Sequence, residues 1–133
     1  MAEPPAAVFV EGIRRFNAGD FFAAHEAFED ALDQAEGDGR WELLLALVQV
    51  AVGYHKAASG HAGAARMLGL GAAKLAAFPP LAWGVAVGDL SRRVAEDLAL
   101  AEGGASLAAR LAAAPPRIGL RRAAGVDRSR RDG

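Results

Sequence analysis

The 133-residue chain contains no cysteine, which excludes a disulfide framework and a thiolate metal site. It also lacks an uninterrupted apolar run of about eighteen residues, the length that a membrane-spanning helix needs. The opening stretch MAEPPAAVFVEG carries an acid and two prolines where a secretion signal would need a basic residue before an apolar run. We therefore expect a cytoplasmic protein that does not associate with membranes.

Aromatic residues are scarce at 7%, although apolar residues make up 53% of the chain and consist mainly of alanine, leucine and valine. Alanine and leucine are strong helix formers, and no alternating strand pattern occurs anywhere in the sequence. The length suits one domain with a single core. The sequence predicts an all-α fold, a compact single-domain bundle of about five helices within residues 1–114.

Glycines and prolines divide this bundle into its expected helices. Pro4 and Pro5 can open a first helix whose apolar stripe ends at Phe16, because proline is tolerated at the first helical position. The next helices are expected at 21–35, 40–59, 62–78 and 85–102, with a short one at 106–114. The third reads WELLLALVQVAVGYH, apolar nearly all round, which predicts that it lies at the centre of the bundle.

The charge of the chain is unevenly distributed although its net value is only −1. Six arginines and two aspartates lie between residues 115 and 133, which makes this stretch about +4 and the body about −5. We expect residues 115–133 to form a flexible basic tail that packs little against the domain. The tail has no interleaved aromatics and the body is acidic, so a nucleic-acid partner is not expected.

The stretch FNAGDFFAAHEAFE places a histidine and two glutamates on the second expected helix. At about 100° per residue, His25 and Glu29 are neighbours that flank the apolar arc, while Glu26 faces outward. We expect His25 and Glu29 to point together toward the third helix and to belong to one polar cluster. Gln49, within the most apolar segment, would find its hydrogen-bond partners there.

Three interpretations of these residues remain open. The first is a structural network that holds the helices in register. The second is a divalent metal site formed by His25, Glu29 and His55, or by His61 in place of His55; no cofactor is otherwise predicted. The third is an acid–base site that uses His25, Glu26 and Glu29, although no nucleophile is visible beside them. Whether the protein is an enzyme stays open.

Two resemblances follow from the same stretch. FNAGDFFAAHEAFEDAL resembles the second half of a tetratricopeptide repeat, but no second copy follows about 34 residues on, so only a local helix pair of that kind is expected. The wider pattern FNxGxFFxAHExxE, then LVQ, then YH, then GAxRML resembles a small family of bacterial and archaeal helical proteins catalogued as domain of unknown function 309. The matching residues are Phe16, Asn17, Gly19, Phe22, Ala24, His25, Glu26, Glu29, Leu47, Val48, Gln49, Ala51, His55, Gly60, Gly63, Ala64, Arg66 and Leu68.

That resemblance implies a compact helical bundle and no established activity. The family pattern tends to carry a tryptophan where this chain has Leu32 and an asparagine where it has His61. Among functions, a binding or scaffold module with a structural His–Glu cluster is favoured, and a metal-binding or hydrolase-like protein is the alternative. The partner would be another protein or a second copy in a homodimer, with the stripe of the 85–102 helix as its first candidate surface.

Overall fold

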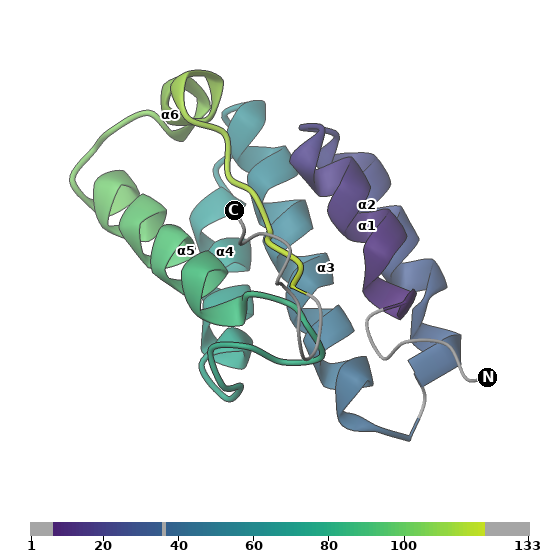
Figure 1. The fold of residues 1–133 in the computed structure, drawn as a ribbon. Helices are drawn as coiled ribbons and strands as arrows, with labels where there is room; N and C mark the ends of the chain where they lie inside the picture. The colour runs from purple at the N-terminus through teal and green to yellow at the C-terminus, as the bar shows by residue number, and fades with distance from the viewer. Residues whose placement is uncertain (1–6, 36, 122–133) are drawn as a thin grey trace, which may run out of the picture.

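The computed structural model describes residues 7–35 and 37–121, and helices make up most of this part of the chain (Figure 1). Its six α-helices are α1 (Ala7–Asn17), α2 (Phe21–Asp30), α3 (Gly39–Ala58), α4 (Ala64–Leu75), α5 (Val87–Glu102) and α6 (Leu107–Ala113). In this part of the chain the only β-structure is a pair of isolated bridges. The predicted all-α fold is confirmed, whereas the role expected for Pro4 and Pro5 falls outside the described residues.

Helix α3 lies at the centre, with α1 and α2 on one side and α4 and α5 on the other (Figure 1). Its buried residues face in several directions and include Leu43, Leu44, Ala46, Leu47, Val50, Ala51, Gly53, Tyr54 and Ala57. This confirms the central position predicted from its nearly uniform apolar sequence. Glycines on α3 and α4 also allow these two helices to pack closely against each other.

Two glycines set the crossing of α3 and α4. A Cβ atom added to Gly53 would lie 2.7 Å from the side chain and 3.0 Å from the backbone nitrogen of Leu68. A Cβ atom on Gly71 would lie 2.7 Å from the Val50 side chain and 3.2 Å from its backbone nitrogen. Both clashes involve backbone, which cannot rotate out of the way, so the two helices can pack this closely only where the side chain is a hydrogen atom.

The turn between α1 and α2 forms as the sequence predicts, but α2 ends earlier than expected. Gly19 adopts φ +85° after α1, and the Asp20 side chain accepts a hydrogen bond from the backbone N–H of Ala23 at 3.0 Å. The helix was expected to reach Ala35, yet it stops at Asp30 and continues as a 3₁₀ turn (Leu32–Ala35). Acidic residues at its C-terminal end oppose the helix dipole, which favours this early stop.

The connection between α4 and α5 contains a tight turn. Ala82 and Val85 exchange two backbone hydrogen bonds of 3.1 and 2.8 Å around Trp83 and Gly84, both of which have positive φ. A bulky residue rarely adopts positive φ, and the cost is offset here by packing. The Trp83 ring lies against Phe9 and Phe78, with ring centroids 6.3 and 6.2 Å away.

Residues 117–121 pack against the bundle, which corrects the expected start of the tail. Ile118 is only 1% exposed, and its backbone N–H and C=O both bond to the side chain of Asn17 at the end of α1. Farther on, Gly119 accepts a hydrogen bond from Ala86, and Arg121 donates one to Gly84. The expectation of little packing is wrong for these residues because backbone pairing and one apolar side chain hold them. The rest of the tail, 122–133, lies outside the described residues.

The apolar stripe of α5 faces the core of its own bundle. Val87, Leu90 and Val94 are at most 1% exposed, and Leu98 packs against the core cluster. The first candidate surface for a homodimer is therefore covered within the monomer, and a homodimer stays a prediction that needs another surface. Among the described residues, no helix is both long enough and apolar enough to cross a membrane.

Candidate functional site

His25 and Glu29 are neighbours on α2, but only one of them is turned inward. The Nε2 atom of His25 lies 3.5 Å from Oε1 of Glu29, and its Nδ1 atom lies 3.0 Å from the backbone oxygen of Phe22. The His25 side chain is 19% exposed and that of Glu29 is 54% exposed. The inward direction predicted for Glu29 is therefore wrong, because its carboxylate reaches water. Glu26 is exposed as expected.

An exposed phenylalanine separates the two histidines that the metal interpretation combined. The Phe22 ring lies 5.1 Å from the His25 ring and 5.3 Å from the His55 ring, measured between centroids. His61 instead accepts a hydrogen bond at Nδ1 from the backbone N–H of Gly63. Within the described ranges, no three His, Cys, Asp or Glu side chains form a group that could hold a metal ion. The structure thus does not bring His25, Glu29 and His55 together as ligands.

The interhelical polar cluster exists elsewhere, around Asp97 on α5. Asp97 is fully buried, and its Oδ2 atom accepts hydrogen bonds from the Tyr54 hydroxyl at 2.6 Å and from Nε of Arg93 at 2.8 Å. Its Oδ1 atom accepts a third from Nε of Arg110 at 2.8 Å. Arg93 also donates to the backbone oxygen of Ala114. This Asp97 cluster ties α3, α5 and α6 together.

The electrostatics of the cluster follow from this burial. Removal from water, strengthened by the hydrogen bond to Asp97, raises the pKa of Tyr54 well above its usual value near 10. Hydrogen bonding to the same carboxylate raises the pKa of Arg110. The buried carboxylate is thereby compensated by two guanidinium groups and a phenol. We assign the cluster a structural role, since both carboxylate oxygens of Asp97 accept hydrogen bonds from the side chains that surround them.

Sequence reasoning missed Asp97, although a signal was present. The predicted stripe of the fifth helix contains Leu90 and Val94, and Asp97 follows at helical spacing, three residues after Val94 and seven after Leu90. A carboxylate at a core position must be paired, and Arg93 one turn earlier was the nearest candidate. By contrast, the buried Oε1 atom of Gln49 has no hydrogen-bond partner within the described residues, so the partner expected for it near His25 and Glu29 is not found.

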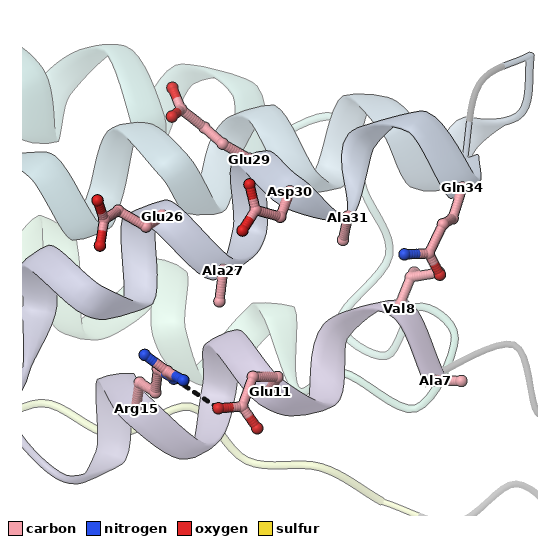
Figure 2. Close-up of a pocket in the computed structure, with 10 residues that line it drawn as sticks. All are labelled: Ala7, Val8, Glu11, Arg15, Glu26, Ala27, Glu29, Asp30, Ala31 and Gln34. Atoms are coloured by element: carbon pink, nitrogen blue, oxygen red, sulfur yellow. Dashed lines mark hydrogen bonds and ion pairs between the residues drawn. The ribbon is translucent and has the colours of Figure 1, made fainter.

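A second candidate site is the groove between α1 and α2, shown in Figure 2. Its volume is about 490 Å³. Small side chains form its floor, where Ala27 and Ala31 point toward α1 (Figure 2). Its other lining residues are Ala7, Val8, Glu11, Arg15, Glu26, Glu29, Asp30 and Gln34. His25 does not line it, so the structure places the suggested acid–base residues on two different surfaces of α2.

The α1/α2 groove carries excess negative charge. On α1, Arg14 and Arg15 donate to Glu11 at 2.6 and 2.5 Å, and these hydrogen bonds lower the pKa of Glu11 to about 2. On α2, Glu26 and Asp30 form no ion pair with any described residue and lie across from the Glu11–Arg15 pair (Figure 2). The groove therefore combines small apolar side chains with two carboxylates, those of Glu26 and Asp30, that form no ion pair within the described part of the chain.

Both surfaces of α2 lie within one matched segment of the chain. Residues 9–68 match the model of the family described as domain of unknown function (DUF309). The resemblance predicted from the sequence is confirmed for this segment. No curated protein matches the chain.

Some of the features described above lie inside the segment that matches DUF309, and others lie outside it. The α1/α2 groove, the His25–Glu29 pair and Tyr54 fall almost wholly inside it. Asp97 and its two arginines lie outside, as does the segment 117–121 that covers Asn17. The matched helices α1 to α3 are thus completed by later parts of this chain.

Proposed function

We propose that the protein is a binding module whose α1/α2 groove holds an arginine- or lysine-rich segment of a partner protein. The observation that carries the proposal is the pair Glu26 and Asp30, exposed on α2 beside a floor of small side chains and without ionic partners among the described residues. A groove between two packed helices is a common receptor for an extended or helical segment. Its carboxylates would select a cationic one.

The alternative of a metal-binding or hydrolase-like protein has less support from the geometry. His25 lies on the α3 side of α2, its ring is separated from His55 by Phe22, and its carboxylate neighbour is largely hydrated. An acid–base pair of this kind needs a pocket that admits a substrate and excludes water. The groove instead offers an open and acidic surface suited to a peptide.

Fluorescence anisotropy with a short labelled arginine peptide tests the proposal. The variant Glu26→Gln/Asp30→Asn should weaken binding roughly three- to tenfold, since each exposed ion pair contributes up to about 1 kcal/mol. The control Glu42→Gln/Glu102→Gln removes the same charge from exposed positions on α3 and α5. Binding that is equally weakened in both variants, or absent from the wild type, would contradict a groove-specific site.

A further inference from the structure

The segment 117–121 fixes the point from which the last twelve residues depart. Arg121 donates its backbone N–H to Gly84 at 2.6 Å, and the adjacent Trp83 packs on Phe9 of α1. Arg121 therefore lies near the N-terminal half of α1. The same half of α1 supplies Ala7, Val8 and Glu11 to the α1/α2 groove. Trp83 and α1 therefore link the departure point to the groove.

The residues that follow have the charge and length to reach this groove. Residues 122–133 contain four arginines and two aspartates, and the run 128–131 reads RSRR. Twelve extended residues span at most about 40 Å. A helix with its side chains is only about 10–12 Å across. The groove itself presents Glu26, Glu29 and Asp30, so the charges of the two surfaces are complementary.

We propose that residues 122–133 occupy the α1/α2 groove of their own chain and compete there with a partner. This inference rests on the proposed function, because it takes the groove to be a receptor for cationic segments. The tether makes the competition efficient, since a short linker supplies an effective concentration in the millimolar range. Weak ion pairs then suffice for the tail to compete with the peptide, and salt, which screens these pairs, should weaken the competition.

The competition is measured with the labelled arginine peptide on the full-length chain. Arg128→Gln/Arg130→Gln/Arg131→Gln should tighten peptide binding about two- to fivefold relative to the wild type. The control Arg66→Gln/Lys74→Gln/Arg92→Gln removes three positive charges from α4 and α5 and should change binding less. If all three proteins bind with the same affinity, the occupancy of the groove by the tail is excluded while the proposed function stands.

The position of the segment is measured by disulfide trapping, which is clean because the chain has no cysteine of its own. Ser129→Cys combined with Gln34→Cys, at the groove, should cross-link within one chain faster than Ser129→Cys combined with Arg66→Cys on α4. High salt should remove the difference. Equal rates for the two pairs would overturn the inference, and cross-links found only between two chains would overturn its intrachain form. Loss of peptide binding in every protein would instead count against the proposed function.

Discussion

Two polar groups of this bundle, the His25–Glu29 pair on α2 and the Asp97 cluster on α5, differ in what surrounds them. The His25–Glu29 pair joins two residues of the same helix, and over half of the Glu29 side chain is exposed. The Asp97 cluster joins three helices around a carboxylate with no exposure at all. In the sequence, however, the exposed pair is the easier one to notice, because AHExxE is a conspicuous motif. Asp97 is a single acidic residue within an ordinary amphipathic stripe.

The difference indicates that the burial of a polar group, more than its presence in a recognisable motif, determines how much the group affects the stability of the fold. A hydrated ion pair exchanges its interactions with water at little cost, so it contributes little. A buried carboxylate cannot do so, and each lost partner leaves a desolvated charge. The stability of the bundle should therefore depend strongly on Asp97 and weakly on His25.

The sharpest contrast is expected from Asp97→Ala. Removing the carboxylate leaves Arg93 facing a buried space without its partner, and breaking a buried ion pair in this way costs about 3–5 kcal/mol. Denaturant unfolding followed by circular dichroism measures the loss. Asp89→Ala is the matched control, because this aspartate lies on the same helix and is 61% exposed. A loss for Asp97→Ala that equals that of the control would remove the distinction between the two clusters.

Ile118→Ala extends the comparison to apolar residues within one short segment. Ile118 is buried and Leu120, two positions later, is 40% exposed. Truncating a buried isoleucine costs about 2–4 kcal/mol, whereas truncation of the exposed leucine should cost less than about 1 kcal/mol. Thermal and denaturant unfolding of both variants provide the test. Two equally mild variants would restore the flexible tail that the sequence had suggested.

The ionisation of Tyr54 should contribute to the pH dependence of the free energy of unfolding, and this contribution comes from one residue because Tyr54 is the only tyrosine in the chain. Its pKa is raised by folding, so the unfolded chain ionises first and stability falls as pH rises above about 10. Below that value the contribution is fully present. Tyr54→Phe should lower stability by about 1 kcal/mol at neutral pH and lose this component of the alkaline decline.

Ultraviolet absorbance of tyrosinate gives an independent readout of the same residue. In the folded wild type, Tyr54 should stay protonated beyond pH 10 and ionise only as the protein unfolds. Arginines do not interfere with this signal, and no second phenol contributes to it. Ionisation near pH 10 with the fold intact would mean that the Asp97 cluster is open to water.

The smallest effect is expected from His25→Ala, at less than about 1 kcal/mol. The pair with Glu29 is partly hydrated, and the contact of Nδ1 with the Phe22 backbone oxygen is local to one helical turn. Added zinc should leave the melting temperature of both proteins unchanged. A rise with zinc in the wild type that His25→Ala abolishes would revive the metal interpretation, because a ligand that binds only the folded state raises stability.

Periodicity and punctuation predicted most of the helices because both are local. Helices end close to Gly19 and Gly60, and the all-round apolar α3 proved central, but the helix expected at 62–78 runs only from Ala64 to Leu75 and so ends before the Pro79-Pro80 pair. Helix ends were less accurate where short-range hydrogen bonds intervene, as at Asp30. The start of α5 at Val87 rather than Val85 has a different origin, because Val85 and Ala86 pair with residues 119 and 120.

The candidate site was harder to predict because its partners are distant in the sequence. The i,i+4 relation of His25 and Glu29 could be calculated, but the side of α2 that α1 covers could not. The groove arises from the way α1 packs on α2, and Asp97 meets Tyr54 43 residues away along the chain. Such contacts depend on how the helices pack against one another, and a helical wheel describes only one helix at a time.

The contact between Asn17 and Ile118 also has a consequence for the order in which the protein is made. Asn17 is synthesised 101 residues before the backbone groups that its side chain binds. At about 5–20 residues per second, that interval lasts roughly 5–20 seconds. During this time the end of α1 lacks its final neighbour, and it still lacks it after α1 to α3 have been synthesised in full. Nascent chains that end before residue 118 should therefore hold a less protected first helix, and release of the last segment should complete it.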